Sequence, residues 1–193
     1  MGKSLQILSM GWLFLVQLGW PQSREIRLIA GGDLMIGSWV IDVVRREGMD
    51  YPFHQIRSLL KGADVVFANL EAPFTTEGQP FPKQYTFKVP PDLVGVLQAG
   101  GINLVSLANN HIMDYGETGL RHTLAVLDEK GIYYAGAGMN LQQARQPAVL
   151  TIGERTIGFL AYSLTFPQEF WPPTPQRAPV FPIINLFTRM SAN

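Results

Sequence analysis

The chain has 193 residues, of which 47% are hydrophobic and 16% charged, so it can bury a core and is not a disordered chain. Fifteen basic side chains balance fifteen acidic ones, which excludes a general positive field, and we expect no nucleic-acid partner. The absence of cysteine excludes disulfides, thiolate catalysis and cysteine-ligated zinc.

The first 24 residues have the pattern of an export signal. Lys3 precedes a mostly apolar run over residues 5–20, and the next charge is Arg24. A membrane-spanning helix needs about 20 apolar residues, so a cleaved signal peptide and a retained membrane anchor both stay open. We therefore expect an exported, extracytoplasmic protein that is secreted or membrane-anchored, with residues 1–24 as its signal or anchor.

Strand and helix patterns alternate over residues 25–165, which predicts one α/β domain. The strand over 25–30 leads into Gly31 and Gly32, where we expect the backbone to turn sharply. Residues 38–47 and 54–61 are predicted helices, followed by a strand over 64–70. The later elements are a half-exposed strand over 85–89, a helix over 92–99, a strand over 102–107, a helix over 117–130, a strand over 132–135 and a hairpin of 147–152 with 155–162.

Polar side chains stand where three of these strands end. Asp33 follows the first strand, Asn69 and Glu71 close the second, and a cluster from Asn109 to Asp114 follows the strand over 102–107. In open α/β sheets, ligands bind beyond the carboxyl ends of the strands. The alternatives are local: Asp33 capping a turn, Glu71 as a solvated loop carboxylate, and the asparagines shaping a turn.

The chemistry of such a cluster favours a metal site. Carboxylate and amide oxygens suit hard cations, and imidazole adds affinity for zinc, manganese or iron. Two such ions can clamp a phosphate and activate water, while a nearby histidine protonates the leaving oxygen. Three strand ends of this kind in one short chain therefore predict a binding or catalytic site.

Several motifs surround these strand ends. They are Gly32-Asp33-Leu34-Met35, Asn69-Leu70-Glu71-Ala72-Pro73, Phe87-Lys88-Val89-Pro90-Pro91, and Ser106-Leu107-Ala108-Asn109-Asn110-His111 with Asp114-Tyr115-Gly116. On these motifs the chain resembles the bacterial capsule-synthesis CapA family, also called poly-gamma-glutamate synthesis proteins. The resemblance implies a calcineurin-like metallophosphoesterase fold, an α/β/β/α sandwich with a dinuclear site for divalent metal ions (Mn, Fe or Zn). It also implies an exopolymer or phosphoester substrate and a membrane-bound synthesis complex as partner.

The resemblance also assigns roles by position. Asp33 is similar to the first metal-binding carboxylate, Glu71 to the second acidic ligand and Asn110 to the amide ligand. His111 is similar to the general acid or transition-state stabiliser. Three further residues are expected to line the site: Asn69, Asn109 and Asp114.

Two departures from the family pattern affect this expectation. The wider superfamily has Asp-x-His as its first motif, but Met35 stands where that histidine would be. Family members also continue with a His-Trp-Gly-type motif, whereas residues 166–193 form a proline-rich stretch without histidine. We therefore expect an incomplete sandwich, and a metal-dependent phosphoesterase-like hydrolase if the site is active. The alternative is a non-catalytic, truncated envelope protein that binds polymer or assembly partners.

Overall fold

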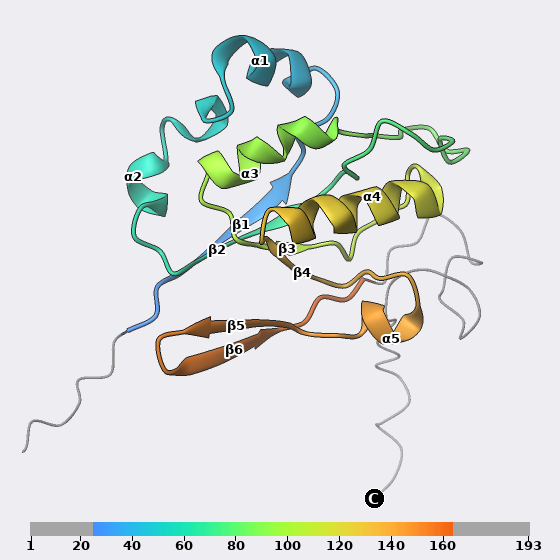
Figure 1. The fold of residues 1–193 in the computed structure, drawn as a ribbon. Coiled ribbons are helices and arrows are strands. Elements are labelled where there is room, and N and C mark those ends of the chain that lie inside the picture. Colours follow the sequence, from blue (N-terminus) through green and yellow to red (C-terminus); the bar gives the residue numbers. More distant parts are fainter. Residues whose placement is uncertain (1–24, 164–193) are drawn as a thin grey trace, which may run out of the picture.

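The computed structural model describes residues 25–163, which form a parallel sheet with helices on one face and a hairpin on the other (Figure 1). The sheet has the order β1-β2-β3-β4, and every neighbouring pair is parallel. Its strands are β1 (Leu28–Leu34), β2 (Val65–Leu70), β3 (Leu104–Ser106) and β4 (Tyr133–Ala135). Strands that alternate with helices in sequence have therefore formed the expected α/β architecture.

One face of the sheet is covered by helices. They are α1 (Val40–Glu47), α2 (Arg57–Leu60), α3 (Gly95–Ala99) and α4 (Gly116–Glu129), with short 3-10 turns η1 (Tyr51–Phe53) and η2 (Pro91–Val94). The short helix α5 (Leu141–Ala144) lies on the other side, beside the hairpin (Figure 1). In α4, the buried Leu120 and Leu127 lie seven positions apart on one face. They share a core with Val66, Ala68 and Leu70, the alternate residues of β2.

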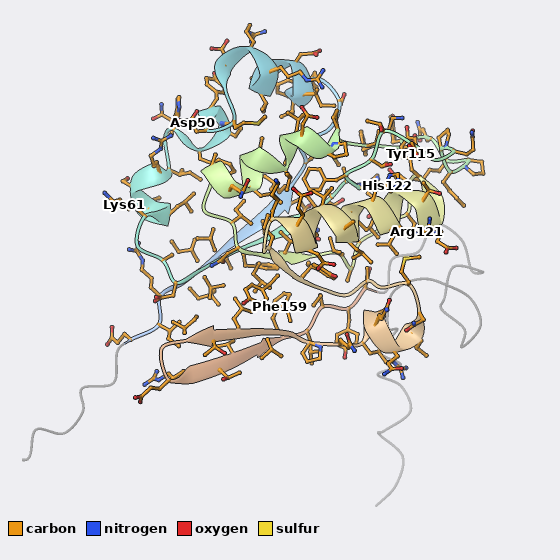
Figure 2. The ribbon with its side chains drawn as sticks, viewed as in Figure 1. Asp50, Lys61, Tyr115, Arg121, His122 and Phe159 are labelled. Atoms are coloured by element: carbon orange, nitrogen blue, oxygen red, sulfur yellow. The ribbon has the colours of Figure 1, made fainter. Side chains whose placement is uncertain are left out.

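The opposite face of the sheet packs against the hairpin of β5 (Ala148–Ile152) and β6 (Arg155–Phe159). Gly153 allows the tight connection because it adopts a φ of +60°. The ring centroids of Phe67 and Phe159 lie 4.9 Å apart. Phe159 lies between the hairpin and the sheet (Figure 2). A small second core surrounds them. The predicted hairpin is confirmed, and β2 is therefore covered on both faces.

Two local predictions were wrong. The backbone does not turn at Gly31 and Gly32, because β1 continues through them to Leu34, and a register shift between Ala30 and Asp33 accommodates them. Residues 85–89 form no strand apart from one isolated bridge between Phe74 and Val89. Tertiary contacts explain both results: pairing with β2 extends β1, and contacts with the loop after β3 hold residues 85–89.

The expected signal or anchor (1–24) and proline-rich tail (166–193) lie outside the described residues. Within residues 25–163, no helix has the length and apolar character needed to cross a bilayer. The layers formed by residues 25–163 are the helices, the four-stranded sheet and the two-stranded hairpin. A complete α/β/β/α sandwich is not seen in this part of the chain.

Candidate functional site

The carboxyl ends of the first three strands meet at one position of the sheet. Asp33 pairs with Asn69 across β1 and β2, and Asn69 pairs with Ser106 across β2 and β3. Side chains of a strand alternate between its two faces. Asn69 and Glu71 alternate with the core residues Ala68 and Leu70, so they lie on the hairpin side of the sheet rather than under the helices.

Asn69 joins the two carboxylates of the site. Its amide Nδ2 donates hydrogen bonds to Asp33 Oδ1 at 2.8 Å and to Glu71 Oε1 at 2.5 Å. Asp33 and Glu71 therefore share one neutral donor group, which fixes one oxygen of each carboxylate. The other oxygen of each takes no part in these two bonds.

Asn109 determines how the loop after β3 begins. Its Oδ1 accepts hydrogen bonds from the backbone N–H groups of His111 and Ile112, both at 3.0 Å. Its Nδ2 donates to the carbonyl of Leu70 at 2.8 Å and to Asn69 Oδ1 at 3.1 Å. Asn109 thus shapes the turn, as the local alternative predicted, and also connects that turn to β2.

His111 lies between a buried carboxylate and the open side of the site. Its Nδ1 is 2.9 Å from Asp114 Oδ2, and its Nε2 is 4.0 Å from Glu71 Oε2. Asp114 is fully buried. A carboxylate can only accept, so we assign the proton to Nδ1 as donor to Asp114. Nε2 then carries a free lone pair on the side of Glu71, the usual arrangement of a catalytic or ligating imidazole.

Residues of the loop between β2 and η2 close over the back of His111. The Phe87 ring lies 4.9 Å from the imidazole, and its backbone N–H donates to Asp114 Oδ2 at 2.7 Å. Lys83 Nζ contacts Asp114 Oδ1 and donates to the carbonyl of Asn110 at 2.8 Å. Sequence reasoning missed Lys83, because a loop lysine is normally solvated and no local pattern marks a buried one.

Two negative charges oppose each other at the open side of the site. Burial raises the pKa of Glu71, and the neighbouring Asp33 carboxylate raises it further. His111 and the Asn69 hydrogen bond act in the opposite direction. A cation between the two carboxylates would stabilise their charged forms and so oppose the upward shift.

The donor atoms partly fit a divalent cation. Asp33 and Glu71 supply the carboxylate oxygens that hard cations prefer, and His111 Nε2 supplies a nitrogen. Within residues 25–163, however, no three histidine, aspartate or glutamate side chains gather closely enough to form a metal site. Asn110, the expected amide ligand, takes part in these contacts through its backbone carbonyl. The described residues thus offer two carboxylates as cation ligands rather than a complete coordination shell.

Known proteins are similar to this chain over the range that contains the site. The family described as bacterial capsule synthesis protein PGA_cap matches residues 27–180. The chain belongs to this family. The expected relation to CapA proteins is thereby confirmed, and the match includes every residue of the site.

Individual relatives give the same assignment. The capsule biosynthesis protein CapA of Bacillus anthracis is 28% identical over 149 residues, which cover 75% of this chain and 36% of the relative. A probable polyglutamine synthesis accessory protein of Mycobacterium tuberculosis is 34% identical over 63% of this chain and 33% of its own length. The PGA biosynthesis protein CapA of Bacillus subtilis is 30% identical, over 60% of this chain and 31% of its own. The chain thus spans about a third of the length of these relatives.

Proposed function

We propose that this PGA_cap protein binds a divalent cation at Asp33 and Glu71 and hydrolyses a phosphoester with the help of His111. The observation that carries the proposal is that one amide group, that of Asn69, donates to the carboxylates of both Asp33 and Glu71, with the imidazole Nε2 4.0 Å from Glu71 Oε2. The expected cation is manganese, iron or zinc, as one ion or a dinuclear pair. When bound, such an ion polarises a phosphoryl oxygen and makes water a stronger nucleophile.

The protein's own residues supply the proton transfer. Asp114 holds Nδ1–H of His111, so Nε2 can accept a proton and return it to a leaving oxygen. The Phe87 ring packs against the imidazole and limits its rotation. Asn69 keeps Asp33 and Glu71 in register with each other, so both can face the same ion.

The relatives suggest the process that this site serves. The names of the Bacillus proteins assign them to capsule and PGA biosynthesis. We propose that the chain serves capsule or poly-γ-glutamate synthesis, with an exopolymer or phosphoester as substrate and a membrane-bound synthesis complex as partner, and this likeness supports the proposal. The apolar run after Lys3 supports export, and cell fractionation would test it: a soluble cytosolic protein with an intact N-terminus would contradict export.

A second candidate function is binding without catalysis. It is favoured by the finding that no three acidic or imidazole side chains of residues 25–163 form a metal site. In that case the carboxyl edge of the sheet would bind a polymer or an assembly partner, and His111 would have a binding role. The first candidate function requires hydrolysis of a phosphoester, and the second does not.

The test is an assay of the full chain with a generic aryl phosphodiester and added manganese. We expect manganese-dependent cleavage that Asp33→Ala abolishes and that His111→Ala slows by about 10²-fold or more, the scale of general acid–base catalysis. Asp92→Ala is the matched control, because this exposed carboxylate lies on η2. Manganese binding without cleavage would favour the second candidate. If Asp33→Ala kept both manganese binding and cleavage, the proposed site would be contradicted.

A further inference from the structure

We propose that residues 51–61, the η1–α2 segment, lie on the surface of the bilayer that anchors the chain through residues 5–20. The partner of this surface is a lipid bilayer that contains anionic phospholipid. The inference rests on one part of the proposed function, export in a membrane-anchored form. It depends neither on the cation site nor on hydrolysis.

The η1–α2 segment exposes large apolar side chains. Leu59 is 61% exposed and Ile56 is 41% exposed. The two belong to one helical turn, because the N–H of Leu59 donates to the Ile56 carbonyl at 2.9 Å. Tyr51 on η1 is half exposed, whereas Leu60 is partly buried against the main core. The segment thus binds the domain through one side and presents apolar groups on the other.

Cationic side chains accompany these apolar groups. Arg57 and Lys61 flank Leu59 in the sequence, and both are exposed. Arg57 contacts the carboxylate of Asp50, so Lys61 provides most of the attraction to a phosphate. At a membrane surface, apolar side chains enter the headgroup region while long basic side chains extend to the phosphates. Tyrosine is enriched at the same depth, which suits Tyr51.

Arg27 fastens the η1–α2 segment to the beginning of the sheet. Its guanidinium donates to the carbonyl of Leu59 at 2.8 Å and to that of Lys61 at 3.3 Å. Its backbone N–H donates to Oδ2 of Asp64, the residue before β2, at 2.9 Å. The exposed apolar side chains of α2 therefore lie at the edge of the sheet where β1 and β2 begin (Figure 1).

The short link before β1 limits how far this edge can lie from a membrane. The apolar run ends at Trp20, five positions before Glu25. An extended chain spans at most about 3.6 Å per residue, so five positions reach about 18 Å at most. An anchor formed by that run therefore holds the beginning of β1 close to the bilayer. Leu28, at the beginning of β1 and 51% exposed, adds apolar surface to this edge.

The candidate site lies at the other end of the same strands. Asp33 is five residues beyond Leu28 on β1, which corresponds to about 17 Å of strand. Lys61 and Tyr115, which follows the loop after β3, likewise lie at opposite ends of the molecule (Figure 2). Contact of the η1–α2 segment with lipid therefore turns the site away from the bilayer. A substrate of that site would be a polymer in the aqueous phase rather than a phospholipid headgroup of the same membrane.

The test measures the depth of single fluorophores in vesicles that carry the full chain. The chain has no cysteine, so one introduced cysteine can be labelled selectively with bimane. Leu59→Cys and Tyr85→Cys are matched positions, because their side chains are 61% and 62% exposed. Each labelled chain is reconstituted in equal parts of phosphatidylcholine and phosphatidylglycerol, with and without nitroxide-labelled lipid.

We expect nitroxide lipid to quench the label in Leu59→Cys and to leave the label in Tyr85→Cys unquenched. Tyr85 is the reference because the neighbouring Phe87 packs on His111, at the carboxyl edge of the sheet. Equal quenching of the two labels would overturn the proposal. No quenching in Leu59→Cys chains that float with the vesicles would also overturn it and would favour a protein partner for this surface. Chains that do not float would contradict the anchor and the bilayer contact together.

A substitution in the Leu59→Cys background tests the apolar contact. Ile56→Asp places a charge among the exposed apolar groups, and we expect it to remove most of the quenching. Tyr162→Asp is the control, because Tyr162 is 38% exposed and follows Ala161, which lies beside Gly136 after the carboxyl end of β4. Quenching that is the same with and without Ile56→Asp, in chains whose circular dichroism shows a folded domain, would contradict the contact.

A second substitution tests the attraction to anionic lipid and covers the case in which Ile56→Asp does not fold. Lys61→Glu should weaken the quenching in vesicles with phosphatidylglycerol and leave it unchanged in vesicles of phosphatidylcholine alone. Arg145→Glu, an exposed position after α5, is the matched control and should change neither. Equal effects of the two substitutions would overturn the role of Lys61. The measurement uses no manganese and no turnover, so a negative phosphoesterase assay would leave its result intact.

Discussion

The side chain of Asn109 fixes the direction in which the side-chain amide of Asn69 points. Asn109 Oδ1 is committed to two backbone N–H groups, so its Nδ2 must be the atom that faces Asn69. The Asn69 atom that meets this donor must be an acceptor, its Oδ1. The NH₂ group of Asn69 is thereby directed at Asp33 and Glu71. Asn69 consequently orients the two carboxylates and does not offer its oxygen to a cation.

Replacement of Asn109 by alanine should destabilise the fold. The substitution leaves four polar groups of a buried site without their partner, and one unsatisfied buried group costs about 1–3 kcal/mol. We expect a loss of about 3 kcal/mol in the free energy of unfolding, measured by urea denaturation. Asn140→Ala is the control: it removes a single cap of α5, and we expect a loss of about 1 kcal/mol. Equal losses in the two variants would contradict the central position of Asn109.

Replacement of Glu71 by glutamine should stabilise the metal-free protein at neutral pH. The pKa of Glu71 is raised by burial and by Asp33, so the folded state binds this proton more tightly than the unfolded chain. The destabilising effect of the charged form appears as the pH rises through the folded pKa. It is absent below the ordinary value of 4.5.

Thermal unfolding as a function of pH measures this effect. Glu71→Gln should exceed the wild type in stability at pH 7, and the two should converge as the pH falls below about 4.5. A wild type that is more stable than the variant at pH 7 without metal would show that Glu71 is stabilised as an anion. Asp92→Asn is the control, because Asp92 is exposed on η2.

The strand ends could be predicted from the sequence, but the contacts behind them could not. Neighbouring parallel strands end at the same edge of a sheet. The polar residues that follow three apolar runs therefore predict that Asp33, Asn69 and His111 lie close together. The identity of the supporting groups depends on how a long loop closes. Lys83 is separated from Asp114 by 31 positions, and no periodicity connects them.

The wrong local predictions have the same origin. Gly31 and Gly32 have low strand propensity, yet pairing with β2 extends β1 through both of them. The alternation of Tyr85 and Phe87 with polar residues predicts a strand. In the structure Phe87 packs on His111 while Tyr85 is largely exposed, so the alternation reflects the two sides of a loop.

The hairpin should contribute measurably to stability through Phe159. Its ring packs on Phe67 of β2, and truncation of a partly buried phenylalanine to alanine should cost about 2 kcal/mol. Val149→Ala on the same hairpin is the control, because Val149 is half exposed and its loss should stay within about 0.5 kcal/mol. Urea denaturation of both variants provides the comparison. If Phe159→Ala lost no more stability than Val149→Ala, the packing of the hairpin on the sheet would be contradicted.

The most direct test of the proposed site is anomalous X-ray scattering from crystals of the full chain soaked with manganese. We expect an anomalous peak at coordination distance from the carboxylates of both Asp33 and Glu71, about 2.0–2.3 Å from an oxygen of each. The peak should be absent from Asp33→Ala crystals soaked in the same way and present in Asp92→Ala crystals. A peak elsewhere on the molecule with none between Asp33 and Glu71, or no peak at saturating manganese, would contradict a cation site at this edge of the sheet.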